Sequence, residues 1–317
     1  MFNRLKITRR YGLVLLSVLV LASAQDAPDL QERIITITYD GGNRSSPDLR
    51  FGPYEYSHPD PEGLVATVSN LTIYGSEATL EAPQGVMIAD AEGQRQASFA
   101  GGVRVERGRL RATGPELDYD EATGLGTLER DVDILVEPPP ERADQGDVTI
   151  TANSVTFDVD TDVSTSRGDV LLINGNQRAE AQELIYEEAR DLAKLSSSGQ
   201  QVRAVRQNDD GELIIVADEI RTLTQTDGLL AVGNVIIVDG PIRSTGDVVF
   251  FDDASDRAEI VGSPATSLER DDQGEPLFEI SGARIEQRID LDVVNLLDDS
   301  VPPGFDETDF QLSSEAE

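Results

Sequence analysis

The chain has 317 residues, no cysteine, no tryptophan, one histidine (His58) and a formal net charge of −34 at pH 7. Without cysteine it has no disulfide or thiolate metal site, and a lone histidine leaves no multi-histidine metal site and no ordinary Ser-His-Asp triad. The acidic balance argues against nucleic acid as a partner, because phosphate binding needs clustered lysine and arginine. We therefore expect no cofactor, no metal and no enzymatic activity.

The first 24 residues have the pattern of an export signal. A basic stretch precedes an apolar run over residues 11–21, and Ala22-Ser23-Ala24 follows it. The run is short for a membrane span, which needs roughly 20 apolar residues. We predict a signal peptide over 1–24, cleavage after Ala24 and a periplasmic protein. The alternative is an uncleaved inner-membrane anchor formed by residues 11–24.

The rest of the chain repeats with a period near 65 residues. An apolar-x-aromatic tripeptide recurs at spacings of 63, 67 and 65, its aromatic residues being Tyr56, Tyr119, Tyr186 and Phe251. Apolar residues alternate with polar ones around these tripeptides, which indicates strands with one buried face. Acidic turns separate strand pairs of about 30 residues, so the pattern predicts an all-β fold, a stacked antiparallel β-roll or jellyroll.

A run of three prolines at 138–140 suggests a division of this region. Residues 25–140 and 148–292 are the predicted N-terminal and C-terminal β-repeat regions, with 141–147 as the loop or linker between them. The pattern leaves open whether 25–292 form one continuous roll or two modules. Residues 293–317 are acidic and contain a Pro-Pro break, and we predict a disordered tail there.

Two local features refine the strand assignment. Residues 179–195 have high helix propensity, yet Leu184 and Tyr186 keep the repeat register, so we predict strand because tertiary context overrides propensity. Gly168 and Gly233 lie 65 residues apart, each before an alternating apolar strand. We predict that they are equivalent positions, and that a side chain there is destabilising if their φ is positive.

Two segments carry a resemblance to a known family. Residues 150–173 (ITANSVTFDVDTDVSTSRGDVLLI) and 215–240 (IVADEIRTLTQTDGLLAVGNVIIVDG) resemble the OstA-like repeat. This repeat is shared by the periplasmic lipopolysaccharide transport proteins LptA and LptC and by the periplasmic part of LptD. Gly233-Asn234-Val235 matches the repeat's signature fully, and Gly168-Asp169-Val170 has Asp in place of Asn. The resemblance covers roughly 50–290. It implies an open β-jellyroll whose apolar interior shields lipid acyl chains, and end-to-end assembly by strand pairing, as in an extended LptA.

The residues expected to line such a groove are the inward members of the repeated strands: Leu117, Tyr119, Val155, Phe157, Leu184, Tyr186, Ile220, Val249, Phe251 and Ile285. The ligand implied by the resemblance is lipopolysaccharide or another envelope amphiphile, with Arg178, Arg221 or Arg243 as local contacts for its head group. The alternative is an ordinary dry core in a structural or adhesive β-repeat protein that acts by protein contacts. Asp158, Asp160 and Asp162 are interpreted as a solvated turn, since no calcium-loop pattern surrounds them.

Partners are expected at the two ends of the roll. An open sheet leaves unpaired backbone groups at its edges, which favour pairing with another strand. The candidates are residues 33–39 (RIITITY) and 277–289. Pairing with other OstA-like envelope proteins, or head-to-tail between copies of this chain, would follow. The negative charge opposes self-association, so it should be weak and should strengthen with salt.

Overall fold

The structure is a computed structural model that describes residues 36–42, 64–74, 78–89, 95–120, 123–143, 146–158, 161–208, 211–223, 228–271, 273–298 and 304–315. Within these residues the strands are antiparallel and form one sheet of 18 strands, which confirms the predicted all-β class. No helix of the described residues is long and apolar enough to cross a membrane. The predicted export signal, His58 and residues 33–35 of the predicted 33–39 edge lie outside the described residues.

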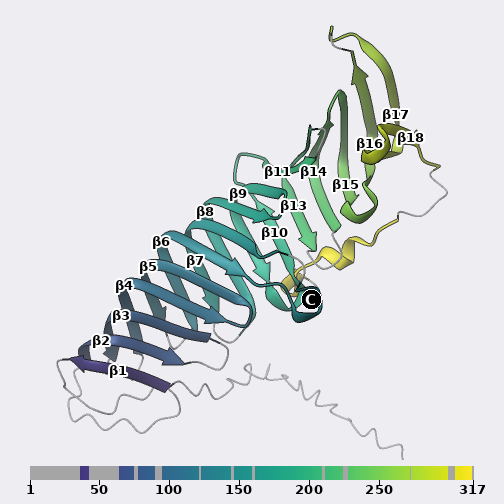
Figure 1. The fold of residues 1–317 in the computed structure, drawn as a ribbon. Helices are drawn as coiled ribbons and strands as arrows, with labels where there is room; N and C mark the ends of the chain where they lie inside the picture. The colour runs from purple at the N-terminus through teal and green to yellow at the C-terminus, as the bar shows by residue number, and fades with distance from the viewer. Residues whose placement is uncertain are drawn as a thin grey trace, which may run out of the picture.

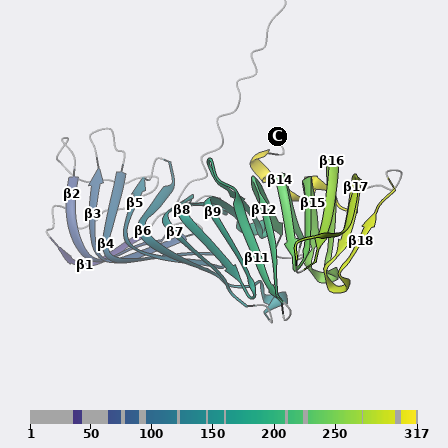
Figure 2. The same ribbon diagram turned by 90° about the horizontal axis from the view of Figure 1, so that it is seen from above.

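The strands follow one another along the molecule in chain order (Figures 1 and 2). Their bounds are β1 Thr36–Gly42, β2 Leu64–Tyr74, β3 Ala78–Ala89, β4 Arg95–Arg107, β5 Leu110–Asp120, β6 Leu125–Val136, β7 Val148–Asp158, β8 Val163–Asn174, β9 Gln177–Glu187, β10 Leu192–Ser196, β11 Val202–Asn208, β12 Gly211–Ala217, β13 Glu219–Leu223, β14 Gly228–Asp239, β15 Ile242–Asp252, β16 Arg257–Arg270, β17 Pro276–Arg288 and β18 Val293–Leu296. Short 3-10 helices are η1 Pro140–Arg142, η2 Glu188–Arg190, η3 Asp253–Ser255, η4 Ile289–Leu291, η5 Glu307–Phe310 and η6 Ser313–Glu315.

Most long strands bend in the middle, so that the sheet folds into two facing walls. The ladders of β4 to β8 and β14 to β16 are each interrupted by a register shift near the strand centre. Between β9 and β14 each long strand is instead divided in two. β11 and β12 pair with each other in what we call the first wall, and β10 and β13 pair in the second wall. Inner side chains of both walls share one hydrophobic core.

The bends in β8 and β14 are made by the predicted glycines. Gly168 has φ 74° and Gly233 has φ 81°, and the following Asp169 and Asn234 both have φ 48°. Asp and Asn tolerate this left-handed conformation better than most residues, and glycine adopts it without a Cβ penalty. A Cβ on Gly168 would also lie 2.6 Å from the Nδ2 atom of Asn153. The predicted equivalence of the two glycines is confirmed.

The acidic turns have a shared conformation. The 3-10 helices η2, η3 and η4 each end on an aspartate in the left-handed region, with φ of 48° at Asp191, 50° at Asp256 and 52° at Asp292. Aspartate adopts this left-handed conformation more readily than most residues do. This explains why it recurs where the chain reverses after each of these tight turns. Residues 179–195, which the repeat register predicted as strand, form β9, η2 and β10.

β6 and β7 pair from Leu125 with Asp158 to Val136 with Val148, so the described residues of the predicted loop or linker at 141–147 lie between neighbouring strands of one sheet. The predicted disordered tail is wrong for its described part. Residues 293–296 form β18, and residues 304–315 pack on the outside of the second wall, because Phe310 and Leu312 are buried there.

Candidate functional site

The interior between the two walls contains all ten predicted groove residues. Each is at most 4% exposed, and all ten belong to the same core. This core runs from Leu80 in β3 to Ile289 in η4. The alternation of the strands explains the arrangement, since every second residue of a strand points to the same face. The interior of the described roll is therefore one long apolar seam.

The seam contains a cavity where the long strands are divided. The cavity measures about 60 Å³ and is lined mainly by apolar side chains from both walls. Ala204, Leu213 and Ile215 contribute from β11 and β12 in the first wall. Of the ten predicted residues, Ile220 and Phe251 line it from the second wall. The other eight are packed elsewhere along the seam.

Arg206 closes the cavity at the open side between the walls. It lies in β11 of the first wall, and its guanidinium forms ion pairs with Asp253 and, at 2.5 Å, with Asp256 at the end of the second wall. The same guanidinium lies 5.0 Å from the centre of the Phe251 ring. Gln177 adds a hydrogen bond of 2.9 Å from the first wall to Asp253. We call this set of contacts the Arg206 latch.

The charge of Arg206 is secured by these carboxylates. Burial opposes the charged form, but hydrogen bonds to Asp256 and Asp253 outweigh it and raise the pKa of Arg206. The guanidinium is therefore a permanent cation directly above an apolar cavity. Arg178, one of the predicted head-group contacts, is exposed at the border of the same cavity.

A second set of arginines bridges the walls further along the roll. Arg107, at the end of β4 in the first wall, is 3% exposed and donates hydrogen bonds of 3.0 to 3.2 Å to four backbone carbonyls of residues 158–163 in the second wall. Arg109 contacts Asp191 at 2.7 Å, and Asp191 also accepts a 2.7 Å hydrogen bond from the hydroxyl of Tyr186. Burial, followed by this hydrogen bond, raises the pKa of Tyr186, so the phenol stays neutral. These contacts hold this part of the roll closed.

Some residues singled out in the sequence lie elsewhere. Arg221 faces the outside of the second wall, where it contacts the C-terminal segment, and Arg243 is exposed on β15. Asp162 caps a turn, since its carboxylate accepts a hydrogen bond of 2.6 Å from the backbone of Ala189. Arg206 was missed, because its role depends on the meeting of β11 with η3, which are far apart in the sequence. A sequence signal for the division between β10 and β11 is the Ser- and Gly-rich stretch SSSGQ at 196–200.

Comparisons with known proteins give likenesses in structure and none in sequence. No protein-family model matches the chain, and no curated protein matches it in sequence. Among solved structures, it is similar to the crystal structure of LptH from Pseudomonas aeruginosa, described as the LptA-homologous periplasmic component of the conserved lipopolysaccharide transport device. The two share 14% identity with a TM-score of 0.32, over 36% of this chain and 80% of that chain.

Proposed function

We propose that this protein is a non-enzymatic periplasmic lipid carrier of the LptA type. It would hold the acyl chains of lipopolysaccharide, or of another envelope amphiphile, between its two walls. In this way it would help move the lipid to the outer membrane. The observation that carries the proposal is the apolar cavity beneath a cationic latch, set in a continuous apolar seam. An amphiphile with an anionic head matches this arrangement, because burial of each CH₂ contributes about 0.8 kcal/mol and the head can pair with arginine.

Entry from the open side requires the walls to separate. The Arg206 latch is the contact that opposes this at the cavity, and β10 and β13 are strands of only five residues each, so this portion of the second wall has short ladders. The walls are also joined there by the chain segments 197–201 and Asp218 rather than by continuous strands. These features favour local opening at the cavity over opening elsewhere along the roll.

The ends of the roll supply edges for partners. Residues 276–284 of β17 pair with β16 on one side, while β18 covers only Ile285 to Arg288 on the other. Leu277 and Leu296 are 61% and 59% exposed beside this edge. We propose pairing with another OstA-like protein, or head-to-tail between copies, through this edge and through β1.

The test is binding of a fluorescent fatty acid to delipidated full-length protein. We compare Ala204→Phe, which fills the cavity, with Ala283→Phe, the same change at an exposed strand position. Saturable binding that is lost in the first variant and kept in the second supports the carrier function. Phe251→Asp should also abolish binding.

A structural or adhesive role with a dry core is the second candidate. It is favoured by the burial of the ten inner residues, which leaves a small cavity in the closed form. If the folded wild-type protein binds no acyl probe and purifies from its host without lipid, the structural role replaces the carrier function.

A further inference from the structure

The outer face of the second wall holds the C-terminal segment 304–315, shown in yellow near the label C in Figure 1. Phe310 and Leu312 are 3% and 4% exposed and form a small core with Leu192 and Leu230. Phe305 stacks on Phe250 with ring centroids 4.8 Å apart. This core lies on the opposite side of the sheet from the apolar seam. It therefore belongs to a site separate from the cavity.

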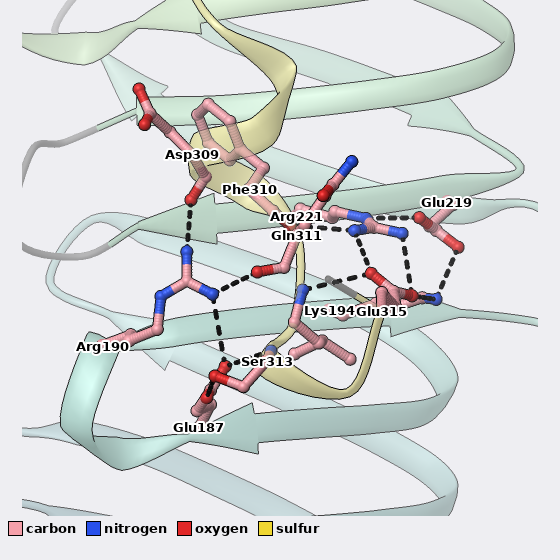
Figure 3. A network of polar contacts seen from close by, with 11 residues as sticks. Glu187, Arg190, Lys194, Glu219, Arg221, Asp309, Phe310, Gln311, Ser313 and Glu315 are labelled. Carbon is pink, nitrogen blue, oxygen red and sulfur yellow. Dashed lines mark hydrogen bonds and ion pairs between the residues drawn. The ribbon is translucent and has the colours of Figure 1, made fainter. Parts of the chain in front are cut away.

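The sheet recognises the backbone of this segment through side chains. Arg190 donates to the carbonyls of Asp309, at 2.8 Å, and of Gln311. Arg221 donates to the carbonyl of Phe310 at 2.9 Å. Glu187 accepts hydrogen bonds from the backbone and the hydroxyl of Ser313 (Figure 3). The ladders of the described strands do not include this segment, so it is bound as a peptide ligand is bound rather than as part of the sheet.

A pair of cations on the outer face of the second wall holds Glu315 of the segment. Lys194 of β10 and Arg221 of β13 are direct cross-strand partners. Two like charges in this relation destabilise a sheet unless an anion lies between them. Glu219 contacts both cations from within the sheet, and Glu315 of the segment adds contacts of 2.6 Å to each (Figure 3). The two cations thus form a receptor for a carboxylate.

We propose that the outer face of β9, β10, β13, β14 and β15 is a peptide-binding site for an acidic segment with aromatic and aliphatic anchors, and that this chain fills it reversibly with its own residues 304–315. The recognised features are an aromatic residue at 310, an aliphatic one at 312 and a carboxylate at 315. A segment of the same chemistry supplied in trans competes for the site. The proposal is independent of lipid binding.

The experiment uses the full-length chain in two forms. In the first form the tail is wild type, and in the second Phe310→Ala and Leu312→Ala remove its anchors while leaving the sheet unchanged. A fluorescein-labelled peptide of residues 304–315 is titrated into each, and binding is followed by anisotropy. The second form, which we call the anchor variant, should bind the peptide saturably at one site. The wild type should bind it at least about tenfold more weakly, because its own tail occupies the site.

Matched peptides and a receptor variant test the specificity. A peptide with Glu315→Gln should bind about tenfold more weakly, since it loses the charge-assisted contacts. A peptide with Glu307→Gln should bind like the parent, because Glu307 is exposed in the docked segment. Arg221→Gln in the anchor variant should weaken the binding of the parent peptide by a similar factor. If the anchor variant, with unchanged circular dichroism, binds no peptide or binds all three equally, the site is not a peptide receptor and the proposal is wrong.

Discussion

The side-chain amide of Asn234 donates a hydrogen bond of 2.7 Å to the carboxylate of Asp218 at the bend between the two walls. One period earlier, the same bond of 3.2 Å joins Asn153 to Asp169, with the two residue types exchanged between the strands. One amide and one carboxylate are thus kept at this place in both layers. The pairing needs a donor on one strand and an acceptor on the other, but not in a fixed order.

Asn234→Asp should therefore lower the free energy of unfolding by about 1 kcal/mol, because it replaces the hydrogen bond by two facing carboxylates. Adding Asp218→Asn should restore most of the loss, since the double variant has the order found in the earlier layer. Urea denaturation of the two single variants and the double variant at pH 7 measures this coupling. Additive losses would contradict the exchangeable pair.

Gly168→Ala should destabilise the protein by about 1–3 kcal/mol, because it forces a side chain into the left-handed region and against Asn153. Gly146 is the matched control. It does not have a positive φ, and nothing lies within 4 Å of a Cβ built there, so Gly146→Ala should change stability by less than about 0.5 kcal/mol. Thermal unfolding of the two variants compares them directly, and equal losses would refute the role given to the bend.

Arg206→Gln should speed the uptake of an acyl probe, because it removes the ion pairs that join the walls above the cavity. Stopped-flow fluorescence at low salt measures the rate, and we expect an increase of about tenfold if the latch contributes about 1.4 kcal/mol to the barrier. Raising the salt concentration should accelerate the wild type more than the variant. Arg243→Gln is the control, since Arg243 is exposed on β15. An unchanged rate in Arg206→Gln would exclude entry by this route.

Docking of the C-terminal segment should depend on pH and should weaken in acid. Burial alone would raise the pKa of Glu315, but hydrogen bonds from Lys194 and Arg221 lower it to about 2 from an ordinary value of 4.5. A carboxyl whose pKa is lowered on docking stabilises the docked state fully above its ordinary value, and this contribution is lost as the pH falls from about 4.5 toward 2. A Phe310→Trp reporter should show release of the segment over that interval. The same reporter with Glu315→Gln should be looser at pH 7 and should lack this transition.

The repeat made much of the fold predictable. The period near 65 located the bends at Gly168 and Gly233, and the register at Leu184 and Tyr186 identified strands where local propensity favoured helix. Both results depend on residues that recur at fixed spacing. All ten inner residues were likewise placed on the buried face, because alternation alone decides which way a strand residue points.

The remainder depends on contacts between distant segments. The C-terminal segment looked disordered because its acids dominate its composition, and only Phe305, Phe310 and Leu312 hinted at an apolar docking face. The Arg206 latch joins residues 47 and 50 positions apart in the sequence, and no local pattern marks that pairing. Whether the inner residues line a groove or a dry core is decided by how closely the walls approach, which alternation does not specify.

The recurring left-handed bend gives the roll a modular length. Residues 168–232 span one full period, and deleting them would join Arg167 to Gly233, so that a glycine again begins the bend and a polar residue again follows it. Such a chain would keep a complete corner at the junction while losing the divided strands and the cavity between them. Duplication of the same stretch would lengthen the molecule by whole layers. The reach of this architecture is thus set by the number of copies of one building block, and it can change in discrete steps without a new kind of turn.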